Sequence, residues 1–284
     1  MSGEIVPGAL TFRRLPASAL LCASALLAAC AHALKEPPAL QAVVGNAEGR
    51  SPRDVDELLA QAEALFARYD FASVRKAAEA WSAAAAADPR RIEGLAGIVK
   101  ANVWVTEHET DPAARLAAAE KGVHAAQWCQ RTAPREPVCD YWLGAALGVQ
   151  ARERPSTGIS ALPKIEAAFK EAGAARPEIE DGGPDRALAL LYLRAPAWPA
   201  GPGDPALALE HAQKAAELKP DYPPNHLALG EVRAATGDGE GSRRAYARAR
   251  DLARIRASAG DPEAKEWMES AEKALAKYAD PRPE

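Results

Sequence analysis

Beyond residue 54, apolar and small residues recur at intervals of three and four, the spacing that places side chains on one face of an α-helix. Four stretches share a more specific pattern: a small residue, a second residue four positions later, a small residue three further on, and a proline five beyond that. Small side chains on this face allow a neighbouring helix to approach closely, and the proline ends the helix. The four copies, the third of which lacks the small first residue, are Ala77-Trp81-Ala84-Pro89, Gly122-Ala126-Cys129-Pro134, Ile165-Phe169-Ala172-Pro177 and Ala208-Ala212-Ala215-Pro220.

A fifth copy sets the period of this pattern. Ser242, Tyr246 and Ala249 lie 34 residues after the corresponding residues of the fourth copy. A Leu-Gly pair, Leu229-Gly230, lies between these two copies, and Leu143-Gly144 occupies the corresponding position after Pro134. A helix–turn–helix repeat of this length and pattern resembles the tetratricopeptide repeat, whose hairpins stack because none can bury its apolar face alone. We therefore predict an all-α solenoid of tetratricopeptide-like helical hairpins for residues 54–284. The alternative is an ordinary helical bundle with coincidental alanines.

The spacing of the terminal prolines departs from a plain 34-residue repeat. They fall at positions 89, 134, 177 and 220, so each of these hairpins carries about nine extra residues. We expect the extra residues in extended loops between the two helices of a hairpin, at 107–111, 154–162 and 195–205. Such loops would collect along one edge of the solenoid, which is commonly a binding edge. A last amphipathic helix, from about Pro262 to Tyr278, suits a C-terminal capping helix.

Composition and charge agree with an all-helical protein that does not bind nucleic acid. Aromatic residues are only 6% of the chain, so alanine and leucine must supply much of the core, and alanine favours helix. Valine, isoleucine and threonine are sparse, which argues against sheets. The net charge of −4 leaves no domain-wide positive excess, and we therefore expect no nucleic-acid partner.

The first thirty residues resemble the signal of a bacterial lipoprotein. Arg13 and Arg14 precede an uncharged apolar run, Leu15–Ala29, which is too short to span a bilayer as a mature helix. The run ends in Leu27-Ala28-Ala29-Cys30, which matches the lipobox. We predict a signal peptide over 1–29 and lipid attachment at Cys30; a buried helix with an ordinary cysteine is the alternative. An aspartate directly after the lipobox cysteine is the usual signal for retention in the inner membrane, and Ala31 stands at that position here. We therefore expect the outer membrane rather than the inner membrane, with the protein facing the periplasm.

Residues 30–53 are expected to form the lipidated cysteine and a flexible tether. Pro37-Pro38, Gly45, Gly49 and Pro52 interrupt this segment, and it shows no sustained periodicity. As a coil, the segment would span about 25–30 Å. We therefore expect the helical body to lie close to the membrane without entering it.

Cys129 and Cys139 lie at the end of one predicted helix and the start of the next. Because the cell envelope is oxidising, a disulfide between them is the favoured interpretation, and two free buried thiols are the alternative. Closing so short a loop would stabilise the fold by about 2.5–3 kcal/mol on the chain-entropy model.

Residues 180–222 resemble the T component (TatT) of tripartite ATP-independent periplasmic (TRAP) transporters. The matching features are Gly182-Gly183-Pro184 with Arg186, Leu191-Tyr192, Pro196 and the glycine-proline loop after it, and earlier Lys121-Gly122 and Tyr141-Trp142. The resemblance implies an envelope lipoprotein of tetratricopeptide-like hairpins that associates with the periplasmic solute-binding subunit and assembles as a trimer. A small apolar ligand is a further expectation. A general outer-membrane scaffold, such as a pilotin or a secretion or assembly factor, is the alternative.

The residues selected for the partner or ligand surface are Tyr141, Trp142, Arg186, Tyr192, Arg194 and Trp198. Trp198 lies in a proline-glycine loop that has no helical face to bury it. One interpretation places it at an interface, because tryptophan beside arginine is typical of binding hot spots. The other interpretation has it fold back and plug the end of its own hairpin.

No set of residues indicates catalysis, a metal site or a cofactor. The motifs of serine hydrolases, zinc peptidases and phosphate loops are absent from the sequence. The local cluster Glu107-His108-Glu109 lies in an expected loop and is more simply a solvated turn than a metal site. Gly237–Gly241 is rich in glycine, yet it falls where the repeat requires the turn of a hairpin. We therefore predict a binding protein rather than an enzyme.

Overall fold

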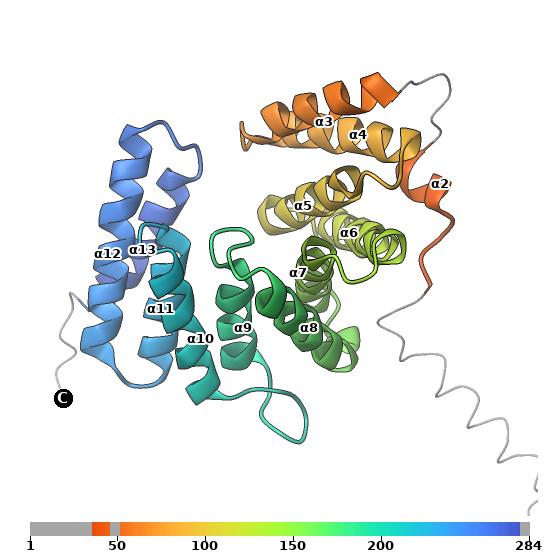
Figure 1. Ribbon diagram of the computed structural model, residues 1–284. Coiled ribbons are helices and arrows are strands. Elements are labelled where there is room, and N and C mark those ends of the chain that lie inside the picture. The colour runs from red at the N-terminus through yellow and green to blue at the C-terminus, as the bar shows by residue number, and fades with distance from the viewer. Residues whose placement is uncertain (1–35, 46–51, 279–284) are drawn as a thin grey trace, which may run out of the picture.

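The computed structural model describes residues 36–45 and 52–278, and in this part of the chain all named elements are α-helices (Figure 1). The helices are α2 (Leu40–Val44), α3 (Pro52–Phe66), α4 (Phe71–Ala87), α5 (Ile92–His108), α6 (Pro112–Thr132), α7 (Pro137–Glu153), α8 (Pro155–Ala175), α9 (Gly183–Arg194), α10 (Pro205–Leu218), α11 (Pro223–Ala235), α12 (Gly239–Ser258) and α13 (Ala264–Ala276). None of the described helices is long and apolar enough to cross a membrane.

From α3 to α12 the helices pack in pairs that form five successive hairpins, and α13 packs on α12 as a terminal cap. The predicted all-α solenoid of tetratricopeptide-like hairpins is confirmed. Aspartate caps two of the helix starts, since the side chain of Asp111 accepts a hydrogen bond from the Ala114 amide and that of Asp204 from the Ala206 amide, both at 2.8 Å.

The repeat positions form the contacts between helices. The small residues of the pattern are buried, and the larger ones fill the space beside glycines of neighbouring helices. A Cβ atom at Gly97 would lie 2.2 Å from the ring of Trp81, and one at Gly144 or Gly230 would lie 2.8 Å from Phe169 or Tyr246. Neighbouring helices, within a hairpin and between the first two hairpins, therefore pack ring against glycine, which explains why the sequence combines very small and aromatic residues.

Two of the three expected loops are helical extensions instead. Glu109 to Asp111 is the whole connection between α5 and α6, and α8 already begins at Pro155. The extra residues lengthen the hairpin helices, since α6 and α8 have 21 residues each against 14 in α10. A proline at the first helical position needs no hydrogen-bonded amide, so Pro155 opens a helix where we expected a loop. Only the third expected loop, 195–204, is present as a long connection.

Part of the expected tether is packed against the solenoid. Val43 and Val44 of α2 are buried, and α2 contacts both α4 and α6. The indole nitrogen of Trp128 donates a 2.9 Å hydrogen bond to the carbonyl of Pro38. The expectation of a flexible tether is therefore wrong for residues 36–45, because two adjacent valines bury apolar surface and a five-residue helix is too short to show a period.

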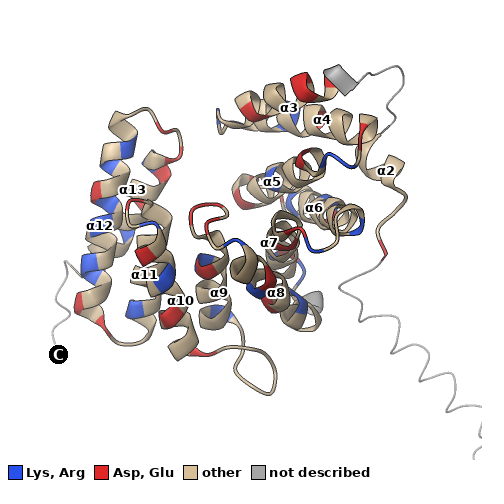
Figure 2. Cartoon of the chain, in the orientation of Figure 1, with Lys and Arg blue, Asp and Glu red and all other residues tan. Residues whose placement is uncertain are grey.

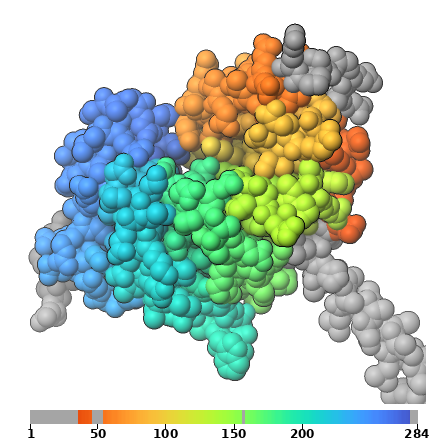
Figure 3. Space-filling model, viewed as in Figure 1, coloured from red at the N-terminus to blue at the C-terminus, as the bar shows by residue number. Residues whose placement is uncertain are grey.

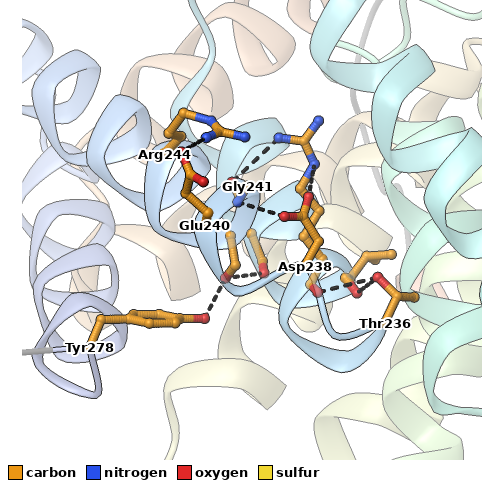
Figure 4. A network of polar contacts seen from close by, with 10 residues as sticks. Thr236, Asp238, Glu240, Gly241, Arg244 and Tyr278 are labelled. Carbon is orange, nitrogen blue, oxygen red and sulfur yellow. Dashed lines mark hydrogen bonds and ion pairs between the residues drawn. The ribbon is translucent and has the colours of Figure 1, made fainter. Parts of the chain in front are cut away.

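The glycine-rich turn between α11 and α12 is structural, as expected (Figure 4). Asp238 caps α12 by accepting a 2.8 Å hydrogen bond from the Gly241 amide. Ser242 donates to the Gly230 carbonyl across the hairpin at 2.8 Å, and Tyr278 donates to Ser242 at 2.7 Å. The end of the described chain is thereby tied to this turn, and Glu240 and Arg244 pair beside it on α12.

Candidate functional site

The stack of hairpins curves so that the first helix of each hairpin lies inside. Among the described helices, α3, α5, α7, α9, α11 and α13 contact one another in succession, whereas α4, α6, α8, α10 and α12 do not. A stack in which only one row of helices touches must bend toward that row. Figure 1 shows the resulting curve, along which the last hairpin returns toward the first.

The inner row brings together six side chains, which we call the inner cluster. Each comes from a different helix or from the residues just before it, and their charges and rings interact across the curve. The members are Tyr69, Lys100, Tyr141, Arg186, Tyr222 and Glu263. The cluster combines two cations, a carboxylate and three phenols, and all of these side chains except the buried Tyr141 are partly exposed. Arginine and tyrosine are enriched in protein interfaces, so this composition suits a recognition surface.

Arg186 is held in place by the turn before α9. Its guanidinium donates to the Asn225 side-chain oxygen at 2.8 Å and to the carbonyl of Glu180 at 3.1 Å. Glu180, Asp181 and Gly182 all have left-handed backbone angles, with φ of 47°, 55° and 84°. Such backbone angles are energetically unfavourable for the two non-glycine residues. The hydrogen bonds that Arg186 donates to carbonyl groups of this turn offset that cost.

Asn225 completes this arrangement and was not predicted from the sequence. It is fully buried, and its amide donates to the carbonyls of Asp181 and Ala215, both at 2.9 Å. Gly183 is required beside it, because a Cβ there would lie 2.8 Å from the Tyr141 hydroxyl. The Gly182-Gly183-Pro184 motif with Arg186 therefore joins α9, the end of α10 and the start of α11.

Two arginines stack on one ring of the inner cluster. The guanidinium carbons of Arg186 and Arg256 each lie 5.2 Å from the centre of the Tyr222 ring, and Trp267 meets the same ring edge-on at 5.4 Å. Burial raises the pKa of Tyr222 above its usual value, and burial raises that of Tyr141 to about 12. Both hydroxyls are therefore protonated at neutral pH.

The two ends of the curve meet at the rim of the inner cluster. Tyr69, in the turn between α3 and α4, interacts with the carboxyl of Glu263 at the start of α13. The Nε2 atom of His108, at the end of α5, lies 3.1 Å from a carboxylate oxygen of Glu266. Figure 3 shows the first hairpin in orange and the last in blue side by side at this edge.

The residues predicted for the partner surface separate into three groups. Tyr141 and Arg186 belong to the inner cluster, where Arg186 is partly exposed; Tyr141 is only 8% exposed, so its prediction as a surface contact is wrong. Trp142 and Tyr192 are buried, and Tyr192 is only 2% exposed because α9 turns it toward Glu166, to which its hydroxyl donates at 2.8 Å. The prediction of these two as surface contacts is therefore wrong. Arg194 is exposed and forms a two-bond ion pair with Glu231 at 2.8 and 3.0 Å.

Trp198 is 87% exposed, so the interpretation that it plugs its own hairpin is wrong. The loop that carries it bonds to itself instead, with the Gly203 amide donating to the Pro196 carbonyl at 2.9 Å. The Asp204 amide ties the end of the loop to Tyr192 at 3.0 Å. The loop projects from the molecular surface between α9 and α10, which presents the indole to solvent (Figures 1 and 3).

A disulfide joins Cys129 and Cys139, whose Cα atoms are 5.3 Å apart, between α6 and α7. The residues Glu107, His108 and Glu109 diverge, because Glu107 pairs with Arg152 and Glu109 with Arg75. Among the described residues no group of three histidine, cysteine or acidic side chains is arranged to hold a metal ion. Cys30 lies outside the described residues.

A cleft of about 600 Å³ lies between α2, α4 and α5. Its lining is mixed, because Val43 and Val74 lie beside the charged side chains of Arg75, Glu79 and Lys121. The apolar surface expected of a site for a small apolar ligand is therefore interrupted by charge in this cleft.

No protein-family model and no curated protein matches the sequence. Among solved structures, PilF of Pseudomonas aeruginosa is similar with a TM-score of 0.50 and 15% identity, over 80% of this chain and 92% of that one. MamA is similar with a TM-score of 0.44 and 14% identity, over 73% of this chain and 96% of that one. At such an identity the likeness to PilF shows the fold alone, and the chain is a tetratricopeptide-like helical solenoid.

Proposed function

We propose that the chain is a lipid-anchored protein of the bacterial envelope that binds a protein partner through the inner cluster and has no catalytic role. The observation that carries this proposal is the convergence of Lys100, Arg186 and Tyr222 on the inside of the curve. Solenoids of this kind use their extended inner surfaces for recognition. The resemblance of residues 180–222 to the TRAP T component supports a periplasmic solute-binding subunit as the partner and a trimer as the assembly.

Photo-crosslinking tests the proposed surface and the identity of the partner together. The crosslinker p-benzoylphenylalanine replaces Glu180, which pairs with Lys100 of the inner cluster, or Arg248, which is exposed on the outer helix α12. Crosslinking of a TRAP solute-binding subunit from position 180 and not from position 248 is expected. Capture of a pilus or secretion component from position 180 would support the alternative scaffold function. Equal crosslinking from both positions would contradict the inner surface as the binding site.

Cys30→Ser is expected to abolish acylation and to leave unprocessed precursor. The lipobox at Leu27-Ala28-Ala29-Cys30 is the reason, since the thiol of this cysteine accepts the diacylglyceryl group. Labelling with a clickable palmitate analogue, followed by separation of inner and outer membranes, measures both anchoring and location. A variant that still incorporates the analogue and fractionates like the wild type would contradict the lipoprotein assignment.

Trp198→Ala is expected to leave the melting temperature within about 1 °C of the wild type, because an exposed indole contributes little burial. If the loop is part of the partner surface, the same variant should weaken capture of the partner by about 1–2 kcal/mol. Ile255→Ala, an exposed apolar residue on α12, is the matched control and should change neither quantity. A Trp198→Ala protein that retains all co-purifying proteins would exclude the loop from the binding surface.

A further inference from the structure

The closure of the curve depends on side chains rather than on packed helices. Within the described part of the chain, α13 packs only against α11 and α12, and no helix of the first hairpins packs against it. The contacts across the gap are those of Tyr69 with Glu263 and of His108 with Glu266. We call these two contacts the clasp. A closure made by side chains at two points can open without unfolding either end.

The histidine of the clasp faces two acceptors. Its Nδ1 atom lies 2.7 Å from the carbonyl oxygen of Trp104, and its Nε2 atom lies 3.1 Å from the Glu266 carboxylate. A neutral imidazole has one N–H donor, whereas the protonated ring has two. Only protonated His108 therefore donates to both partners. The ring is also stacked on Trp104 at 4.1 Å, which fixes its direction toward α13. The neighbouring Glu107 and Glu109 are paired with Arg152 and Arg75.

The carboxyl of the clasp lies among other acids. Burial raises the pKa of Glu263 to about 7, and the charges of Asp261 and Glu266 act in the same direction. The hydrogen bond to Tyr69 and the charge of Lys100, which face Glu263 from the other side of the gap, oppose that shift. Asp261 is itself paired with Arg256 of α12. In the closed curve this carboxyl is therefore desolvated, and desolvation favours its protonated form.

We infer that the clasp is a proton-sensitive gate, closed in mildly acidic conditions and open as the pH rises, which controls access of the partner to the inner cluster. The proton acts on Glu263, where it removes a buried charge from the closed form, while His108 and Glu266 hold the adjoining point of the closure. The control of partner access rests on the proposed function, whereas the opening itself does not.

The expected size of the effect follows from linkage. Glu263 has a pKa of about 7 in the closed state. An exposed glutamate in the open state has a pKa of about 4.3, so the closed form binds more protons. Its advantage is fully present below about pH 4 and is lost as the pH rises through about 7. Between about pH 5 and pH 8 the ratio of closed to open protein should fall on the order of 50- to 100-fold from this carboxyl alone.

The distance between the two ends of the curve tests the gate directly. Spin labels are placed at cysteines that replace Lys76 of α4 and Lys273 of α13, both exposed, in the mature chain carrying Cys30→Ser, whose native disulfide is retained. Double electron–electron resonance should give one short distance at about pH 5.5 and an added longer distance at about pH 8.5. No partner is needed, so a failure of the proposed function and a failure of the gate are distinguishable.

Variants assign the pH response to the clasp. Glu263→Gln keeps a neutral side chain at this position and should hold the short distance at about pH 8.5, whereas Glu266→Gln should open the curve at a lower pH than the wild type. Glu269→Gln, an exposed position on the same helix, is the control and should follow the wild type. Circular dichroism at both pH values verifies that each variant is folded. A distance independent of pH, or an unchanged profile in Glu263→Gln, would overturn the inference.

Discussion

Gly97→Ala is expected to lower the free energy of unfolding by about 3 kcal/mol, at the upper end of the usual cost of overpacking. The added Cβ would lie 2.2 Å from the ring of Trp81, which is fully buried between the first two hairpins and has no room to withdraw. In a domain of this size the melting temperature should fall by roughly 6–12 °C. Denaturant midpoints and thermal melts followed by circular dichroism measure both quantities.

Gly148→Ala is the matched control, and it should have the opposite sign. Gly148 also lies inside a helix, α7, but a Cβ there would meet nothing within 4 Å. Replacing glycine by alanine in a helix interior stabilises by about 0.5–1 kcal/mol, because the unfolded chain has less freedom to lose. Equal effects of the two substitutions would show that the contact of Trp81 with α5 does not limit this packing.

Asn225→Ala is expected to destabilise the protein by about 3 kcal/mol, because one buried amide serves several partners. Its loss would remove one hydrogen bond each from the Arg186 guanidinium and from the carbonyls of Asp181 and Ala215. Urea unfolding of the full chain measures the change. Gln213→Ala, at an exposed position of α10, should change stability by no more than about 0.5 kcal/mol.

A double-mutant cycle separates the network from the burial of a single side chain. Arg186→Ala and Asn225→Ala should be non-additive by at least about 1 kcal/mol, since each removes the partner of the other. Strict additivity would mean that the two residues stabilise the fold independently. The assignment of the Gly182-Gly183-Pro184 motif and Arg186 as one structural unit would then be incorrect.

The helical repeat could be predicted because it depends on the spacing of residues that lie close together in the sequence. Positions such as Ala77, Trp81 and Ala215 show their burial through neighbours three and four residues away, and the structure buries all three. The placement of the extra residues could not be predicted, since Pro155 permits either a loop or a helix start. Whether a loop or a helix forms there depends on whether neighbouring helices offer apolar surface against which the added turns can pack. The local sequence pattern holds no information about those neighbours.

The inner cluster was predictable only where a motif marked it. Arg186 and Tyr141 were identified through resemblance to a family, whereas Tyr69, Lys100 and Glu263 show nothing unusual in their local sequence. They come together because the whole stack bends, and His108 and Glu266, which meet at its rim, are 158 residues apart. Curvature is the sum of small rotations between hairpins, so contacts of this kind cannot be obtained from the sequence of any one hairpin.

The docking of residues 36–45 on α4 and α6 changes what an anchor at Cys30 would do. Glu36 lies six residues after Cys30, and a chain of that length reaches at most about 20 Å. In an acylated protein, this short tether would therefore hold the α2 side of the helical body close to the membrane and restrict its reorientation. Because α2 and α12 lie on opposite sides of the body in Figure 1, the last hairpin would face away from the membrane. Figure 2 shows that α12 is lined with basic side chains, so the surface turned toward the periplasm would be the arginine-rich one.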